Sequence, residues 1–510
     1  MHFDLSQAGQ LAAAIVPDLI VMGGAMLLLL FAVWRRESEA HQRRVGIGAI
    51  VICLVAMAAV ILMMVGHATA SPGIIAVDNF RWATDFLVLL ATIIAIVLTM
   101  DYNRREGIVL GEGYVLLLLS TAGMMLLAAA RDLIIVFLGI ELMSVAVYVL
   151  AGLNRRSSRA AEAAIKYFLL GAFSTGFLLY GIALIYGGTG STDLAVIGSR
   201  ISAASVGSNA MLLAGVALLL VGFAFKVAAV PFHMWTPDVY EGAPTPFTAY
   251  MAAAVKAAAF AAFFRVWLEA FPHAIAEWHA VLWWLAAITM VVGNLIALVQ
   301  KNIKRLLAYS SIAHAGYILV AIVSATALGA SAFLFYLLAY TLATMGAFAV
   351  VVAVGQAGER NQDLADYAGL WRVRPWLATA MAVFMLALLG FPVAGGMGFF
   401  AKWYVLQAAL RAPAPQTHLA VLLVITSVIS AGYYLGVVMV MFMRPRAADA
   451  PALLRTPALT RLVIGAAAVG LLFFGIFPGS LVRVTSASVP TAVAQQSDGG
   501  PPLSAAGRAH

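Results

Sequence analysis

The chain contains 510 residues, of which 64% are hydrophobic and only 10% are charged, and its formal net charge is +8. Soluble domains carry about a quarter charged residues, so this composition excludes a soluble globular protein. The excess of Lys and Arg then points to cytoplasmic loops instead of nucleic-acid binding, and the single cysteine, Cys53, excludes an internal disulfide and a cysteine-ligated cluster.

Apolar stretches recur along the whole chain, and each is long enough to cross a hydrocarbon core of about 30 Å as a helix. We predict an all-α integral membrane protein with fourteen transmembrane spans, at 12–34, 45–66, 83–100, 113–130, 132–153, 161–187, 210–234, 245–268, 279–299, 304–324, 328–355, 375–410, 417–442 and 459–478. The twelfth span is too long for one straight crossing and contains Pro392 and the run GGMG at 395–398, which predicts a broken helix. Pro231 predicts a second break in the seventh span.

Basic residues alternate between the predicted loops and thereby indicate an orientation. One side holds 19 of the 30 Lys and Arg, namely Arg35, Arg36, Arg43, Arg44, Arg104, Arg105, Arg155, Arg156, Arg159, Lys301, Lys304, Arg305, Arg360, Arg372, Arg374, Arg444, Arg446, Arg455 and Arg461. The positive-inside rule places these loops in the cytoplasm and both termini on the periplasmic side, which requires an even number of spans. The first span is acidic at its start and basic at its end, the reverse of a signal peptide, so we expect no cleavage.

Six ionisable residues within the predicted spans are candidate functional residues. They are Glu141 in the fifth span, Lys166 in the sixth, Lys226 in the seventh, Lys256 in the eighth, His314 in the tenth and Lys402 in the twelfth. A charged side chain at membrane depth costs about 2.5–3.5 kcal/mol on insertion scales, so such residues mark candidate pathways or relays.

Structural roles remain open for several of these residues. Lys166 could snorkel and pair with Glu162, four residues before it. His314 could be an ordinary hydrogen-bonded core histidine, and Glu141 a structural counter-ion. Asp18 and Asp85 lie close to the outer interface of their spans, where we expect them to be solvated.

A short internal repeat favours the functional interpretation. The segment GFAFK ending at Lys226 resembles GFFAK ending at Lys402, 176 positions later, and Glu141 and His314 differ by 173 positions. Spans four to eight (113–268) and nine to thirteen (279–442) then form two five-helix units, preceded by spans one to three in 1–112. An odd number of helices inverts the second unit relative to the first, as in many transporters. A loop and last span follow at 443–484, and a polar tail at 485–510 is predicted to be disordered.

The buried residue types favour protons as the transported ion. A lysine in a low-dielectric site binds its proton less tightly, and a carboxylate nearby restores the charged form. Glu141 moving towards or away from Lys226 would therefore switch that lysine between proton acceptor and donor. Sodium prefers oxygen ligands and would be repelled by three central lysines. No nucleotide-binding or metal-binding motif is present, so an ion gradient or partner subunits must supply the energy.

Longer motifs then connect the chain to a known family. The run FKVAAVPFHMWTPDVYEGAPTPFTAYMAAAVKAAAF at 225–260 resembles the antiporter-like subunits of respiratory complex I, as do NIKRLLAYSSIAHAGY at 302–317, DLADYAGL at 363–370 and the GFFAKWYV region around Lys402. The form WTPDVYEGAPTP is similar to the subunit N branch of bacterial NADH–quinone oxidoreductase, the counterpart of mitochondrial NADH dehydrogenase subunit 2. A lysine at 402 agrees with that branch, because the subunit M branch has a glutamate there. The departures are Met397 and the polar C-terminal extension.

The resemblance implies a proton-translocating subunit of the membrane arm in the bacterial inner membrane, with a charged axis at Glu141, Lys166, Lys226, Lys256 and Lys402. It implies no cofactor in this chain, with NADH, FMN, iron–sulfur clusters and quinone bound by partner subunits, and neighbours among the other membrane-arm subunits. One alternative is a subunit of a multisubunit cation/proton antiporter, which has the same fold. A second alternative is a structural anchor without a transport role.

Overall fold

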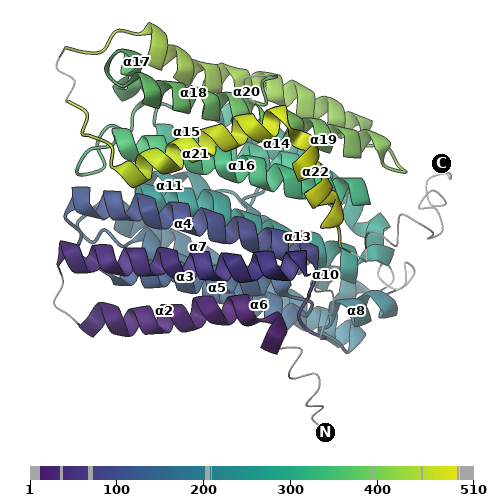
Figure 1. The fold of residues 1–510 in the computed structure, drawn as a ribbon. Helices are drawn as coiled ribbons and strands as arrows, with labels where there is room; N and C mark the ends of the chain where they lie inside the picture. Colours follow the sequence, from purple (N-terminus) through teal and green to yellow (C-terminus); the bar gives the residue numbers. More distant parts are fainter. Residues whose placement is uncertain are drawn as a thin grey trace.

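The structure is a computed structural model that describes residues 12–34, 38–66, 73–201, 207, 209–392, 396–448, 452–490 and 493. Within these ranges the chain is helical, and most long helices run along one common direction (Figure 1). Thirteen described helices are long and apolar enough to cross a membrane. They are α2 (Val16–Trp34), α3 (Glu39–Val65), α4 (Asn79–Glu106), α5 (Glu112–Ala129), α6 (Leu133–Ala151), α7 (Ser158–Thr189), α10 (Ala210–Val227), the continuous helix Thr245–Ala270, α14 (Ile275–Ala297), α15 (Ile303–Val323), α16 (Ala327–Val354), α20 (Thr417–Met443) and α21 (Ala458–Ile476).

The predicted twelfth span supplies the fourteenth crossing as two short helices, α18 (Pro375–Leu389) and α19 (Met397–Arg411). The helix α18 ends at Gly390, which has a φ of +75°, a left-handed conformation that glycine adopts without strain. The predicted break is therefore confirmed, although Gly395 lies outside the described residues.

The seventh span is broken as predicted. The helix α10 ends at Val227, and the chain becomes helical again in α11 (Trp235–Gly242). Pro231 lies in the intervening segment, where its missing N–H prevents a regular helix. The indole of Trp235 donates a 3.1 Å hydrogen bond to the carbonyl of Phe225, so one backbone acceptor freed by the break is satisfied inside the protein.

The two predicted five-helix units share a backbone motif that the sequence comparison did not contain. Before α6, Asp132 forms an isolated antiparallel bridge with Asp193, and before α15, Asn302 forms the same bridge with Asp363. Both partners are displaced by 170 positions. Five crossings separate α6 from α15, so the two bridges lie at opposite ends of the bundle, as an inverted repeat requires.

The core of the bundle lies along three helices. The helix Thr245–Ala270, α15 and α16 are almost entirely buried, whereas only a third or less of the residues in the apolar part of α2, α3, α20 and α21 are buried. Exposed apolar helices at the edge are suited to lipid or to neighbouring membrane subunits. Lys226, Lys256, His314 and Lys402, discussed below, are buried, whereas Glu141 and Lys166 are partly exposed.

Two expectations about polar parts of the chain differ from the structure. Asp18 and Asp85 are not solvated: both are buried and share Arg81, whose guanidinium lies 2.5 Å from Asp18 and 3.3 Å from Asp85. Arg81 precedes Asp85 by four residues on α4, but the sequence could not reveal that Asp18, on a different helix, shares the same partner. The tail is not disordered from 485, because the unpredicted helix α22 (Pro478–Ala487) continues to Ala487. Residues 494–510 lie outside the described part of the chain.

Candidate functional site

Lys226 lies at the C-terminal end of α10, at the break, with only 3% of its surface exposed. Its ammonium donates hydrogen bonds to Ser144 Oγ at 2.8 Å and to the Tyr148 hydroxyl at 3.2 Å, both on α6. Neutral hydroxyls rather than a carboxylate therefore hold this lysine. These two partners were missed by sequence reasoning, although their spacing of three and seven residues from Glu141 places them near one face of the same helix.

Glu141 is partly exposed at the middle of α6 and does not contact Lys226 within ion-pair distance. It interrupts an apolar stripe of four residues that are each 41–53% exposed, namely Ile134, Leu138, Val145 and Val149. These positions follow the helical repeat, so Glu141 belongs to the outward face of α6. Its orientation leaves room for a group from outside the chain.

Aromatic rings connect the Lys226 region with the centre of the bundle. The ring of Tyr148 packs edge-on against Tyr167 with centroids 4.7 Å apart, and Tyr167 stacks on Trp235 at 4.4 Å. Trp235 in turn packs against Tyr240, at a centroid distance of 6.1 Å. The buried Tyr240 hydroxyl has no hydrogen-bond partner among the described residues. A buried hydroxyl of this kind is a natural position for a bridging water.

Lys256 is buried at the centre of the helix Thr245–Ala270, directly after a π-helical turn at Met251–Val255. Such turns occur frequently at functional sites because they re-aim the side chains that follow. The Lys256 ammonium donates to the Ser311 carbonyl at 2.9 Å and also to the Ser311 hydroxyl, both on α15.

His314 follows Ser311 by one turn of α15 and is bound through both ring nitrogens. Its Nδ1 lies 2.7 Å from the Tyr336 hydroxyl, and its Nε2 lies 3.1 Å from the Tyr434 hydroxyl. Tyr434 also shares a hydrogen bond with Ser310. Imidazole and hydroxyl groups can both donate and accept, so this cluster is chemically able to pass a proton between its members.

Lys402 is buried in the first turns of α19, immediately after the twelfth-span break. Its ammonium donates to the Leu389 carbonyl at 2.9 Å and to Ser427 Oγ at 3.1 Å, and it lies 4.6 Å from the centre of the Tyr317 ring. Lys402 and His314 line one small cavity of about 10 Å³, close to the lower limit for a single water molecule. The structure thus brings Lys256, His314 and Lys402 together around α15.

Lys166 lies apart from this buried series, in a charged cluster at the ends of α7, α11 and α15. Its ammonium is 2.6 Å from Glu162 and 2.8 Å from Asp238, and Arg305 lies 2.8 Å from the other oxygen of Asp238. The predicted pairing with Glu162 is confirmed. These groups line a cavity of about 210 Å³, and Asp238 and Arg305 were not singled out from the sequence.

Lys304 and Glu359 form a further buried pair that the sequence did not indicate. Lys304, assigned above to a cytoplasmic loop, is fully buried; it donates to the Ala243 carbonyl at 2.6 Å and lies 3.3 Å from Glu359. Glu359 also accepts hydrogen bonds from the backbone and hydroxyl of Thr245. Burial alone would raise the pKa of Glu359, but the charge of Lys304 and the Thr245 hydrogen bonds outweigh it, and the pKa lies below its ordinary value.

Within the described ranges, no group of three or more His, Cys, Asp and Glu side chains could hold a metal ion. The buried site consists instead of amines, hydroxyls and one imidazole.

Comparison with known families matches residues 130–430 to the family described as NADH:quinone oxidoreductase/Mrp antiporter, transmembrane. A protein named NADH-quinone oxidoreductase subunit N from Gemmatimonas aurantiaca is 54% identical over 501 residues and covers 96% of each chain. Another of the same name from Trichlorobacter lovleyi is 51% identical over 416 residues, covering 81% of this chain and 84% of its own.

Two solved structures superpose on nearly the whole chain. A chain of respiratory complex I from Thermus thermophilus with bound aureothin superposes with a TM-score of 0.78 and 38% identity, covering 93% of this chain and 100% of its own. A chain of the Mrp complex from Dietzia superposes with a TM-score of 0.82 over 95% of this chain and 99% of its own, at only 22% identity, a likeness that shows a common fold.

Proposed function

The chain belongs to the subunit N family of NADH–quinone oxidoreductase, and from this premise we propose that it moves protons through the buried polar series described above. It acts as a membrane-arm subunit of a translocase in which other subunits transfer electrons from NADH to quinone. NADH, FMN, iron–sulfur clusters and quinone then bind to those partner subunits.

One observation carries the assignment of the site. Lys256, His314 and Lys402 each have hydroxyl partners on α15, α16 or α20, so ionisable side chains and proton-passing groups lie close together in the least exposed part of the bundle. Charged groups at such depth are costly and persist where they serve transport. Lys226 and Glu141 form the other end of the series. The packed aromatic rings from Tyr148 to Tyr240 lie between them and the Lys256, His314 and Lys402 cluster.

The two lysines beside broken helices have corresponding environments. Lys226 lies just before the break between α10 and α11, and Lys402 lies just after the break between α18 and α19. Each ammonium is held by a serine hydroxyl and faces a tyrosine ring. We propose that they are equivalent sites in the two inverted units, 113–268 and 279–442, which supports a site near mid-membrane in each.

The position of Glu141 supports a role at a boundary between subunits. A carboxylate on an outward apolar face would be costly against lipid. We propose that a neighbouring membrane-arm subunit covers the α6 stripe and supplies a polar group to Glu141. The orientation with both termini in the periplasm is part of the same proposal and is supported by the basic loops.

Removing one lysine at a time tests this function. We expect Lys226→Ala and Lys256→Ala to abolish most NADH-driven proton uptake by inverted membrane vesicles, while Lys301→Ala, an exposed loop variant, leaves it unchanged. Assembly is checked by the retention of flavin and iron–sulfur proteins during purification. A structural anchor predicts normal proton uptake in the assembled variants, and that result would overturn the proposal.

The alternative of a cation/proton antiporter subunit rests on the fold alone, since the Mrp likeness is only 22% identical. Purification decides between the two. Co-purification of NADH–quinone reductase activity supports the first function, and its absence supports the second.

A further inference from the structure

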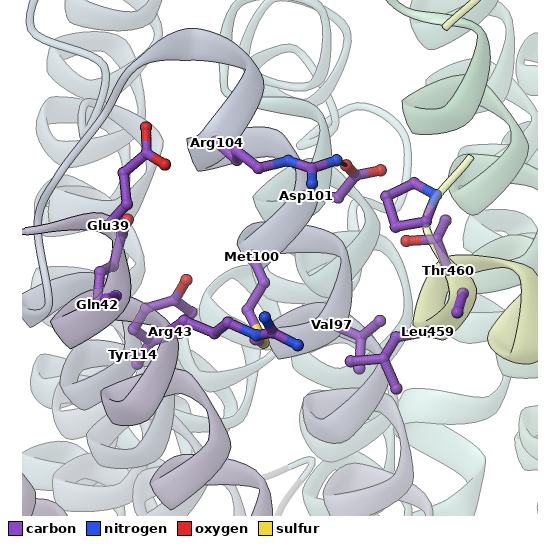
Figure 2. Close-up of a pocket in the computed structure, with 13 residues that line it drawn as sticks. Glu39, Gln42, Arg43, Val97, Met100, Asp101, Arg104, Tyr114, Leu459 and Thr460 are labelled. Carbon is purple, nitrogen blue, oxygen red and sulfur yellow. Dashed lines mark hydrogen bonds and ion pairs between the residues drawn. The ribbon is translucent and has the colours of Figure 1, made fainter. Parts of the chain in front are cut away.

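One cavity lies away from the buried lysines, between α3, α4, α5 and α21. It has a volume of about 550 Å³ and is formed at the first turns of α3 and α21 and the last turns of α4 (Figure 2). The positive-inside rule places these helix ends at the cytoplasmic surface. The cavity is therefore at the depth of lipid headgroups.

Charges of both signs line this cavity. Glu39 and Arg43 come from α3, and Asp101 and Arg104 come from α4. Arg104 is 3.5 Å from Asp101, whereas Arg43 has no ion-pair partner among the described residues. Figure 2 shows the Arg43 side chain extending from α3 towards the side of the cavity formed by Val97 and Leu459. An anion in the cavity would give this guanidinium its missing partner.

Apolar surface continues from the cavity towards the membrane interior. Val97, Met100 and Leu459 line it. Beyond it, α3 exposes Ile47, Val51 and Leu54 on the same stripe as Arg43, and α21 exposes Leu462 and Val469 beyond Leu459. Both helices pack on α4, which lies between them in Figure 1. Their exposed faces are suited to two acyl chains below a headgroup.

We propose that this cavity binds one phospholipid, and that its headgroup is phosphatidylethanolamine. The phosphate accepts hydrogen bonds from Arg43 and Arg104. The primary ammonium has three N–H donors and pairs with Glu39 and Asp101. Two cations and two carboxylates match this zwitterion, whereas an anionic phosphatidylglycerol offers no cation to Glu39, which has no ion-pair partner among the described residues. A choline headgroup lacks N–H donors and would lose those hydrogen bonds.

The test measures lipid retention by the intact purified complex and does not depend on the transport proposal. The complex is exchanged into phosphatidylcholine nanodiscs and supplied with deuterated phosphatidylethanolamine, and bound lipid is counted by native mass spectrometry. Arg43→Gln should weaken binding of one phosphatidylethanolamine roughly tenfold, because it removes a charge-assisted hydrogen bond. Arg44→Gln is the matched control, since the neighbouring arginine does not line the cavity.

A second variant reduces the volume of the cavity and keeps the charged side chains that contact the headgroup. Leu459→Trp keeps all four charges and narrows the apolar side of the cavity, so it should also weaken binding of the lipid. Size-exclusion chromatography confirms that each variant is assembled. The proposal is overturned if Arg43→Gln and Arg44→Gln bind alike, if Leu459→Trp retains the lipid, or if phosphatidylglycerol or phosphatidylcholine binds equally well. Loss of a neighbouring subunit instead of a lipid would mean that a protein segment occupies the cavity, which also overturns it.

Discussion

Replacing Glu141 by glutamine removes one charge and almost no volume, so it isolates the electrostatic role of this carboxylate. In the structure Lys226 is held by Ser144 and Tyr148, and Glu141 is one helical turn away on α6. Three residues of helix correspond to about 4.5 Å along the axis. Rotation of the flexible lysine side chain can therefore exchange a neutral partner for a charged one.

The size of the effect follows from that exchange. At a separation of about 4 Å and an effective dielectric of about 20, the attraction between the ammonium and a carboxylate is about 4 kcal/mol. With glutamine at position 141 this attraction is absent, so the Lys226 ammonium has no charged partner on α6. We expect NADH-driven proton uptake to fall about tenfold or more.

The assay compares proton uptake with NADH oxidation in proteoliposomes that contain the purified complex. Val145→Gln is the matched control, because it places the same amide one turn along the same exposed face of α6 and leaves Glu141 in place. Glu141→Asp should retain part of the uptake, since it keeps the charge. Normal uptake in an assembled Glu141→Gln complex would refute this reasoning.

Three further predictions concern groups that the structure revealed. Tyr434→Phe removes the hydroxyl that joins His314 to Ser310 and should slow proton uptake several-fold, whereas Tyr433→Phe, which changes the adjacent tyrosine, should have a smaller effect in the same assay. Arg81→Met leaves two buried aspartates unpaired and should destabilise the protein by about 3–5 kcal/mol, measured by thermal unfolding. Arg104→Met, in an exposed ion pair, should cost at most about 1 kcal/mol. Glu359→Gln should also lower the unfolding temperature at neutral pH. Because the pKa of Glu359 is depressed in the folded protein, its stabilisation is present above the ordinary value near 4.5 and is lost as the pH falls through the folded-state pKa; the two unfolding temperatures should therefore converge in acid. A constant difference between them at all pH values would contradict the assignment.

Local features of the sequence were enough to predict the spans and their breaks. A run of about 20 apolar residues forms a membrane helix because the bilayer core leaves backbone groups no partner outside the helix. Pro231 predicted the first break through the loss of an N–H, and Pro392 with the run 395–398 predicted the second, although the left-handed residue that ends α18 is Gly390. Lys226, Lys256 and Lys402 were recognisable because a charge in an apolar run is conspicuous whatever surrounds it.

The partners of those charges depended on tertiary structure. Lys256 finds Ser311, and Lys226 finds Ser144, across 55 and 82 residues of chain, and a serine in a helix gives no sign of which residue it will meet. The same limit explains Asp18, whose position near a span end suggested water but whose neighbour is Arg81. By itself the sequence determined which residues enter the membrane and which of them are charged, because both depend on local hydrophobicity. Only the packed structure decided which charges are neutralised, which are held by hydroxyls and which face outwards, because these depend on distances between helices that are far apart in the chain.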